Sequence, residues 1–312
     1  MRLRLTATLL AFATAAALAA DPPKNDAPPK VKSMQEIIDA APATDWRTLD
    51  PANTLYMDLA TGRVVIELAP DFAPEHVANI RTLAKEGYWN GLAIIRSQDN
   101  YVVQWGDPNG DDAGKKKTLG TAKPKLPAEF ERKAKGVPFV RLPDRDGWAP
   151  QVGFSNGFPA ARDPKVDKAW LTHCYAMVGA GRDVPADSSD GSSLYVVTGQ
   201  SPRMLDLNIT LVGRVVQGIE LLSVLPRGTA ALGFYEKPEQ NVPIKAIALA
   251  SEVPEAERTS LQLLRTDSKT FEALVESRRN RRDEWYKRPA GHIDLCNVPL
   301  PVRAVAPTKP AG

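Results

Sequence analysis

The sequence has few of the residues from which metal and thiol sites are built. Its 312 residues include two cysteines, Cys174 and Cys296, and three histidines, His76, His173 and His292. None of these residues stands at the short spacing that tetrahedral zinc sites use. We therefore expect neither a metal nor a cofactor.

The chain also lacks a strong excess of charge of either sign. Forty Lys and Arg residues oppose 37 Asp and Glu residues, which gives a formal net charge of +3. Residues 1–20 hold two arginines and no acid, so their removal leaves 3 − 2 = +1. This balance favours neither a nucleic acid nor an anionic membrane as a partner.

Only the N-terminus carries a long apolar run. Arg2 and Arg4 precede the apolar stretch 5–18, and Ala17-Leu18-Ala19 fits a small-x-small cleavage site. This pattern predicts a signal peptide at 1–20, cleaved after Ala19 or Ala20. The run is short for a membrane span and no cysteine follows it, so neither an uncleaved anchor nor a lipoprotein is favoured. We expect a periplasmic or secreted protein.

In an exported protein, an even number of cysteines favours a disulfide. A bridge between Cys174 and Cys296 would close a long loop and tie the C-terminal part to the rest of the chain. The alternative is a pair of buried, free thiols.

The mature chain is predicted to begin with a leader and linker at 21–53. Residues 21–32 are rich in Pro, Lys and Asp, 34–41 form a short helix, and 42–51 serve as a connector. From Thr54 apolar and polar residues alternate on both sides of Thr61-Gly62, which predicts a β-hairpin. A helix is expected to follow at 75–86, stopped by Gly87.

The stretch 87–107, GYWNGLAIIRSQDNYVVQWGD, predicts two neighbouring strands around a polar corner. Arg96 ends the first apolar run, and Gln104 follows eight residues later on the second. An arginine there places a fixed fork of N–H donors beside an amide group. Taken alone, Arg96 is better explained as a surface cation at a strand edge.

These residues resemble the cyclophilin family, whose signature runs Gly-Tyr…Phe-His-Arg…Phe-Met-x-Gln-Gly-Gly-Asp. The spacing from Arg96 to Gln104 matches, while Phe-His is replaced by Ile94-Ile95. Further blocks follow in the family's order: 62–68 and 74–79 before this stretch, then HCYAMVGAG at 173–181, SSDGSSLYVV at 188–197 and MLDLNITLVGRV at 204–215. The resemblance covers 54–250.

The resemblance implies a mainly β fold, a cyclophilin-like closed antiparallel β-barrel with flanking helices at 54–250. Residues 107–170 depart from the family and are predicted to be mostly loop, with an insertion at about 136–169. Its Trp148, Phe154 and Phe158 are expected to pack onto the barrel. The segment 251–312 is expected to be an extension, with a helix from Asp267 or Ser268 to Glu284 and an extended run at 285–303.

The resemblance also implies site residues. The family's catalytic arginine falls on Arg96 and a substrate-binding glutamine on Gln104. The expected lining of a cup for the proline ring, together with the neighbouring substrate contacts, is Tyr101, Val102, Met177, Tyr195, Met204, Leu205 and Ile209. Several family side chains are replaced, because Ser193, Met204 and Ile209 stand where the family has Gln, Trp and His.

The activity that the resemblance implies is peptidyl-prolyl cis-trans isomerisation. Amide resonance sets a barrier of about 18–20 kcal/mol to rotation about the X–Pro bond. A catalyst needs only to favour the twisted amide, whose nitrogen can accept a hydrogen bond, and to hold the proline ring. The expected partners are proline-containing segments of exported proteins that are folding.

A second hypothesis is an inert peptide-binding module or chaperone on the same fold, because a fold does not fix a function. Arg96 separates the two, since an inert module has no need of it. An unrelated hydrolase is the least favoured class.

The signal peptide gives the first testable prediction. Mass spectrometry of the exported protein should find a mature chain beginning at Ala20 or Asp21, because signal peptidase cuts after a small-x-small site. A mature chain that retains Met1 would contradict the assignment.

Overall fold

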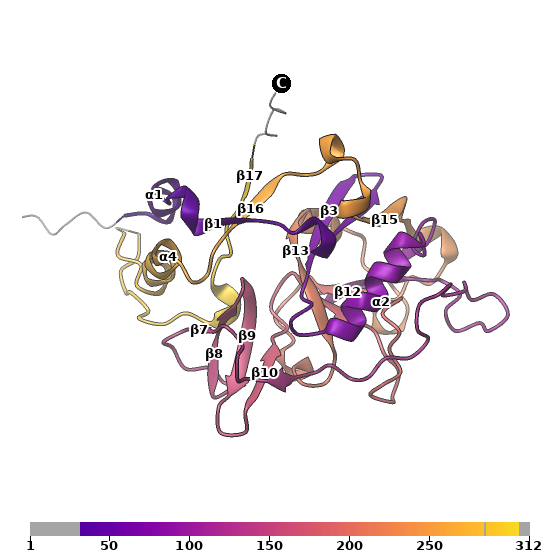
Figure 1. Ribbon diagram of the computed structural model, residues 1–312, viewed down its shortest axis with the longest axis horizontal. Helices are drawn as coiled ribbons and strands as arrows, with labels where there is room; N and C mark the ends of the chain where they lie inside the picture. Colours follow the sequence, from indigo (N-terminus) through magenta and orange to yellow (C-terminus); the bar gives the residue numbers. More distant parts are fainter. Residues whose placement is uncertain (1–31, 284, 306–312) are drawn as a thin grey trace, which may run out of the picture. The chain divides into compact units, whose positions relative to one another are not determined.

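A computed structural model describes residues 32–283 and 285–305 (Figure 1). The predicted signal peptide and most of the predicted leader lie outside these residues. Within the described ranges, no helix is both long and apolar enough to cross a membrane.

The largest element is an antiparallel nine-stranded sheet, as the mainly β expectation requires. Its spatial order is β14-β4-β5-β12-β11-β13-β3-β2-β15. The strands are β2 (Thr54–Leu59), β3 (Gly62–Leu68), β4 (Ala93–Ser97), β5 (Val102–Gly106), β11 (Met177–Ala180), β12 (Leu194–Val197), β13 (Leu211–Gln217), β14 (Val242–Pro243) and β15 (Ala246–Leu249).

The run 242–249 brings the two ends of this sheet together. β14 pairs with β4 and β15 pairs with β2, although only two residues separate β14 from β15. Between them, the Ile244 N–H donates to the Leu92 carbonyl and the Lys245 N–H to the Asp58 carbonyl. The sheet therefore curls into a barrel, an arrangement that removes free edges.

The barrel interior is the first hydrophobic core. Ile66, Ile94, Trp105 and Val196 are fully buried there, and each contributes about 1.5–3 kcal/mol by leaving water. Helix α2 (Pro74–Lys85) packs against this core through Val77, Ile80, Leu83 and Ala84. Pro74 at the first helical position and Lys85 in the last turn suit the two helix ends. The short helix α3 (Ile219–Ser223) follows β13.

The insertion contains an antiparallel sheet, which the expectation of mostly loop for 107–170 did not include. Five antiparallel strands lie in the order β6-β10-β9-β8-β7, and Figure 1 shows β8, β9 and β10 side by side. They are β6 (Arg132–Lys133), β7 (Val140–Arg141), β8 (Gln151–Ser155), β9 (Phe158–Asp163) and β10 (Lys168–Leu171). Two of them are only two residues long, which leaves no alternation to detect.

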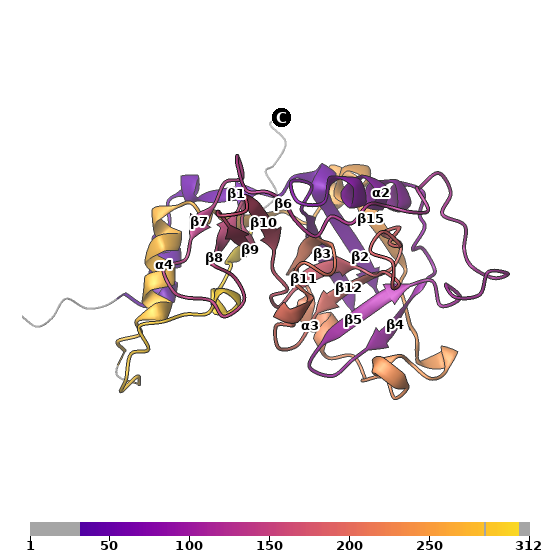
Figure 2. The same cartoon turned by 90° about the horizontal axis from the view of Figure 1, so that it is seen from below.

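The insertion has its own core, which it shares with the C-terminal extension. Phe154 packs edge-to-face on Phe271, with ring centroids 5.1 Å apart. Phe271 belongs to helix α4 (Lys269–Arg279), which lies beside β7 and β8 in Figure 2. Phe158 is buried in the same cluster. Trp148 is 58% exposed, so the expectation that it packs onto the barrel was wrong.

The extension and the N-terminal linker form a second small sheet. β1 (Trp46–Thr48), β16 (Leu261–Leu264) and β17 (Val302–Ala304) pair in the order β1-β16-β17. The predicted connector 42–51 therefore contains a strand. The predicted short helix is present as α1 (Met34–Asp39), capped by Ser33. The helix of the extension is capped by Ser268 and ends at Arg279, five residues before the predicted end at Glu284.

A disulfide joins the extension to the chain just before β11. Cys174 and Cys296 are bonded, with Cα atoms 4.9 Å apart and a sequence separation of 122. Cys174 is buried in the core shared by the insertion and the extension.

The second prediction concerns this bridge. Thiol titration of the denatured, unreduced protein should find no free sulfhydryl, because both cysteines of the chain are paired. Replacing Cys296 with Ser should lower the free energy of unfolding by about 4–5 kcal/mol, the chain-entropy value for so long a loop. Reduction of the parent protein is the matched control and should give the same loss. Two free sulfhydryls in the parent would rule out the bridge.

Candidate active site

A β-bulge turns Arg96 away from the core. Ile94 pairs with Trp105, and both side chains point into the barrel. The register then shifts between Ile94 and Arg96, so that Arg96 pairs with Gln104. Side chains alternate along a strand, and the extra residue therefore moves Arg96 to the outer face beside Gln104.

The guanidinium of Arg96 is held by three acceptors from three segments. Its Nε donates to the Leu232 carbonyl at 2.7 Å, its Nη1 to Gln104 Oε1 at 3.0 Å, and its Nη2 to Gln98 Oε1. An arginine has five N–H donors. Among the described residues, these bonds leave two N–H groups for a bound molecule.

Two aromatic rings lie near the cation. The Arg96 guanidinium is 5.8 Å from the ring centre of Tyr101 and 5.3 Å from that of Phe234. Burial lowers the pKa of Arg96, but a guanidinium stays charged in proteins. The result is a fixed, half-buried cation between two apolar faces, where electrostatic interactions are stronger than in water.

Gln104 links Arg96 to Ser193. Gln104 Oε1 accepts from Arg96, and its Nε2 donates to Ser193 Oγ at 3.0 Å. These bonds orient the amide with its oxygen toward the cation. Ser193 stands where the family has a second glutamine, and here it serves as the partner that fixes Gln104.

An apolar cluster lies on the same outer face of the sheet. Val102, Tyr195 and Val197 are buried, and Tyr101 and Ile209 pack against them. Four of the predicted lining residues therefore come together: Tyr101, Val102, Tyr195 and Ile209. Tyr195 pairs with Gln104 across the strands, which places the apolar floor next to the amide.

Contacts with Gly179 and His173 hold Tyr195 in place. Its ring lies over Gly179, its partner on β11, where a Cβ atom would come within 2.3 Å of the ring. Its hydroxyl bonds His173 Nε2 at 2.9 Å. Burial raises the pKa of Tyr195 strongly, so the phenol stays protonated.

Three other predicted lining residues lie apart from this cluster. Met177 is fully buried in the core that the insertion shares with the extension, because the insertion covers that end of β11. Met204 and Leu205 belong to the 3₁₀ turn Arg203–Leu205, and Met204 is 59% exposed. The prediction that Met177 lines the cup is therefore corrected, because Met177 lies in a different core.

Three residues that contact Arg96 were not predicted from the sequence: Phe234, Leu232 and Gln98. Gln98 stands two residues after Arg96, a spacing that predicts the same face of a strand. Leu232 and Phe234 come from a turn more than 130 residues later, and the backbone of Leu232 has a positive φ of 58°. No local pattern in the sequence indicates that this turn closes over Arg96.

The part of the chain that the structure describes contains no cluster of three His, Cys, Asp or Glu residues that could hold a metal ion. The pattern Gly-x-Ser-x-Gly occurs once, at 153–157, in the hairpin between β8 and β9. Ser155 is buried there at 1% exposure. A hydrolase nucleophile needs an exposed serine on a strand-to-helix turn, which this hairpin does not provide.

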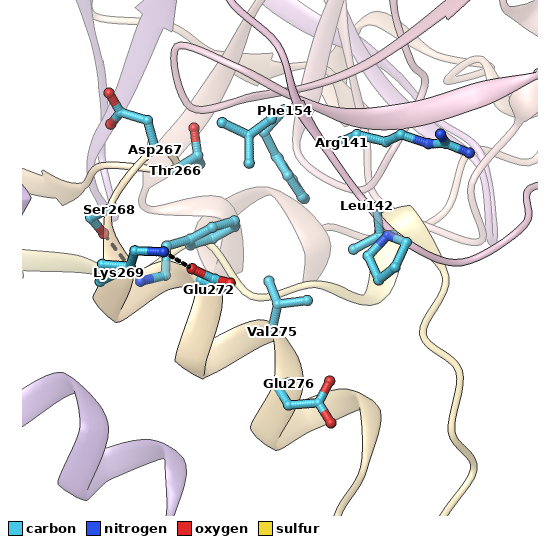
Figure 3. Close-up of a pocket in the computed structure, with 13 residues that line it drawn as sticks. Arg141, Leu142, Phe154, Thr266, Asp267, Ser268, Lys269, Glu272, Val275 and Glu276 are labelled. Carbon is cyan, nitrogen blue, oxygen red and sulfur yellow. Dashed lines mark hydrogen bonds and ion pairs between the residues drawn. The ribbon is translucent and has the colours of Figure 1, made fainter.

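Two cavities lie elsewhere: one between the insertion and the extension, and one that the linker and the end of β3 also line. The larger has a volume of about 510 Å³ and is lined by side chains that include Leu142, Phe154, Phe271 and Val275 (Figure 3). The smaller, of about 350 Å³, is lined by Arg47, Glu67 and Arg265 among others. Neither is lined by Arg96 or Gln104, which lie beside the buried floor of Val102 and Tyr195.

Comparisons with known proteins find proteins of similar sequence and similar fold. A family model described as cyclophilin type peptidyl-prolyl cis-trans isomerase/CLD matches residues 54–249. A "Probable peptidyl-prolyl cis-trans isomerase" of Brucella suis is 30% identical over 188 residues, which are 58% of this chain and 76% of that protein. Human "Peptidyl-prolyl cis-trans isomerase-like 1" is 25% identical over 215 residues, 69% of this chain and 98% of that protein.

Among solved structures, the cyclophilin AquaCyp293 from Hirschia baltica is similar in fold. The TM-score is 0.69 at 24% identity, over 85% of this chain and 95% of the other. This share is larger than residues 54–249, so the likeness in fold extends beyond the range of the family model.

The contact between Tyr195 and Gly179 gives the third prediction. Gly179→Ala should lower the free energy of unfolding by about 1–3 kcal/mol in urea, because the new Cβ overlaps the Tyr195 ring. Gly106→Ala is the matched control on β5, since its Cβ would meet Ser193 no closer than 3.4 Å. Equal stability of the two variants would show that the ring does not lie over Gly179.

Proposed function

We propose that this chain, which belongs to the cyclophilin-type peptidyl-prolyl cis-trans isomerase family, accelerates X–Pro isomerisation in exported proteins through a hydrogen bond from Arg96 to the twisted prolyl amide. The observation that carries this proposal is how the Arg96 guanidinium is held and which of its N–H groups remain available. Its guanidinium is fixed by Leu232, Gln104 and Gln98, yet retains two N–H groups beside an apolar floor.

The reaction needs no proton transfer and no covalent intermediate. In the planar amide the nitrogen lone pair takes part in resonance, whereas in the twisted amide it is free to accept a hydrogen bond. A donor that is fixed in advance therefore binds the transition state better than the ground state. Arg96 supplies this donor and stays charged throughout the working pH range.

The remaining residues position the substrate. Tyr195 and Val102 form the floor for the proline ring, and Tyr101 and Ile209 form its sides. Gln104, fixed by Arg96 and Ser193, offers its second amide hydrogen to a substrate carbonyl. Met204 and Leu205 on the neighbouring turn are the proposed contacts for residues that flank the proline.

Two features support export. The pattern at 1–20 is that of a signal peptide. The bond between Cys174 and Cys296 suits an oxidising compartment, where disulfides persist. We therefore propose that the substrates are proline-containing segments of folding periplasmic or secreted proteins.

The second candidate function is peptide binding without turnover. The burial of the floor favours it, because Tyr195 is only 5% exposed and Val102 only 2% exposed. A shallow floor does not enclose the proline ring, so a peptide that binds along this surface is not driven toward the twisted amide. The two candidate functions differ in whether Arg96 affects the rate of X–Pro isomerisation.

The fourth prediction tests Arg96. In a protease-coupled isomerisation assay, Arg96→Ala should lose about 10²–10³ in rate, by analogy with the loss of one oxyanion-hole donor. Arg96→Lys should also be slow, because a flexible ammonium does not reproduce the planar fork.

The matched control is Arg227→Lys. Arg227 lies near the same strand and bonds Asp99 and the Leu225 carbonyl. This control should keep the parent rate within about twofold, since exposed ion pairs contribute little. If Arg96→Ala is as fast as the parent, the mechanism is wrong. An inactive parent that still binds proline peptides would establish the second candidate instead.

A further inference from the structure

A continuous set of hydrogen bonds runs from the insertion to the floor of the site. The Asp146 carboxylate accepts two bonds from Arg203, at 2.9 Å from Nη1 and 3.1 Å from Nη2. Arg203 Nε donates to Asp206 Oδ2 at 2.6 Å. The insertion is thereby joined to the turn that follows β12.

The same set continues to Tyr195. Asp206 Oδ1 accepts the His173 backbone N–H at 2.8 Å and faces His173 Nδ1 at 2.9 Å. A carboxylate can only accept, so the proton of the neutral imidazole is on Nδ1. His173 Nε2 then accepts from the Tyr195 hydroxyl at 2.9 Å.

Because these groups are buried, the loss of any one of these hydrogen bonds is costly in free energy. The side chains of Asp146 and Arg203 are each 5% exposed, and that of His173 is fully buried. Buried polar groups that lose a partner pay a desolvation cost that no water repays. The Asp146 carboxylate is also fixed in its own loop, because Oδ1 accepts from the backbone N–H groups of Trp148 and Ala149.

We propose that Asp146, Arg203, Asp206 and His173 are positioning residues, through which the insertion holds the Tyr195 ring in place as the floor of the proline cup. The inference rests on the proposed isomerase function. None of the four is a catalytic residue, because each acts on the substrate only through Tyr195. Their expected effect is on the fit of the proline ring and therefore on KM.

The alternative is that these bonds stabilise the fold and do nothing else. The chain offers a matched control in Asp144, two residues away in the same loop. Its side chain is 6% exposed, both of its oxygens accept from Arg279 Nε at 2.9 Å, and one also accepts the Ile293 N–H at 3.1 Å. This ion pair joins the loop to Arg279 of the extension and not to Tyr195.

The experiment compares Asp146→Asn with Asp144→Asn in the full mature chain. Both variants should lose stability. Only Asp146→Asn should raise KM for a proline peptide, by about tenfold, with kcat less affected. Tyr195→Phe should give a similar rise in KM, and the double variant Asp146→Asn/Tyr195→Phe should be no worse than Tyr195→Phe alone. Asp144→Asn/Tyr195→Phe should show no such coupling.

Equal KM values for the two aspartate variants, or additive effects of Asp146→Asn and Tyr195→Phe, would overturn the proposal. If Asp146→Asn fails to fold, Tyr195→Phe remains decisive, because it removes one hydroxyl without unpairing a charge. An unchanged KM in that variant overturns the proposal.

One readout does not depend on activity and separates this proposal from the proposed function. The ¹⁵N shifts of His173 should report a proton on Nδ1 and an accepting Nε2. They should change in Asp146→Asn and not in Asp144→Asn. This result would support the connection even in a parent without isomerase activity, whereas unchanged shifts in both variants would overturn it.

Discussion

The β-bulge between Ile94 and Arg96 is the constraint on which the site depends. Without it, the alternation of side chains would place Arg96 on the same face as Ile94, inside the barrel, where a cation would be unpaired and strongly destabilising. With it, Ile94 fills the core while Arg96 lies beside Gln104 on the outer face. The extra residue also frees the Ile95 carbonyl, which accepts the Tyr235 N–H and so draws the turn 231–235 over the cation.

Segments distant in the sequence complete the site around Arg96 and Gln104. Leu232 and Phe234 hold Arg96 from one side, and Ser193 fixes Gln104 from the other. The insertion reaches Tyr195 through buried, charge-assisted bonds, which are stronger than neutral ones. The disulfide ties the extension to the chain three residues before β11, the strand whose Gly179 lies under Tyr195. The two additions to the barrel are thus placed where they affect the floor of the site.

The barrel and the roles of Arg96 and Gln104 followed from the resemblance to the family. The first hairpin and the two neighbouring strands that carry this pair followed from alternation and turn residues, which are local signals. The insertion sheet did not follow, since its strands are short and lie among glycines and prolines. Met177 was placed in the cup by the resemblance to the family, but the insertion covers that part of the sheet. Phe234 was missed because its contact with Arg96 is made by an irregular turn. In each case the missing information is a tertiary contact, which no local pattern encodes.

The central claim is that a fixed guanidinium at this surface catalyses rotation about X–Pro bonds. NMR exchange spectroscopy of a short X–Pro peptide with a small amount of the mature protein tests it most directly. Uncatalysed exchange takes about 10–100 s, too slow for cross-peaks between cis and trans signals. We expect the protein to make these cross-peaks appear and the Arg96 Nε–H signal to shift as the peptide is added. A peptide that shifts the Arg96 signal without exchange cross-peaks, or that leaves both unchanged, would contradict the central claim.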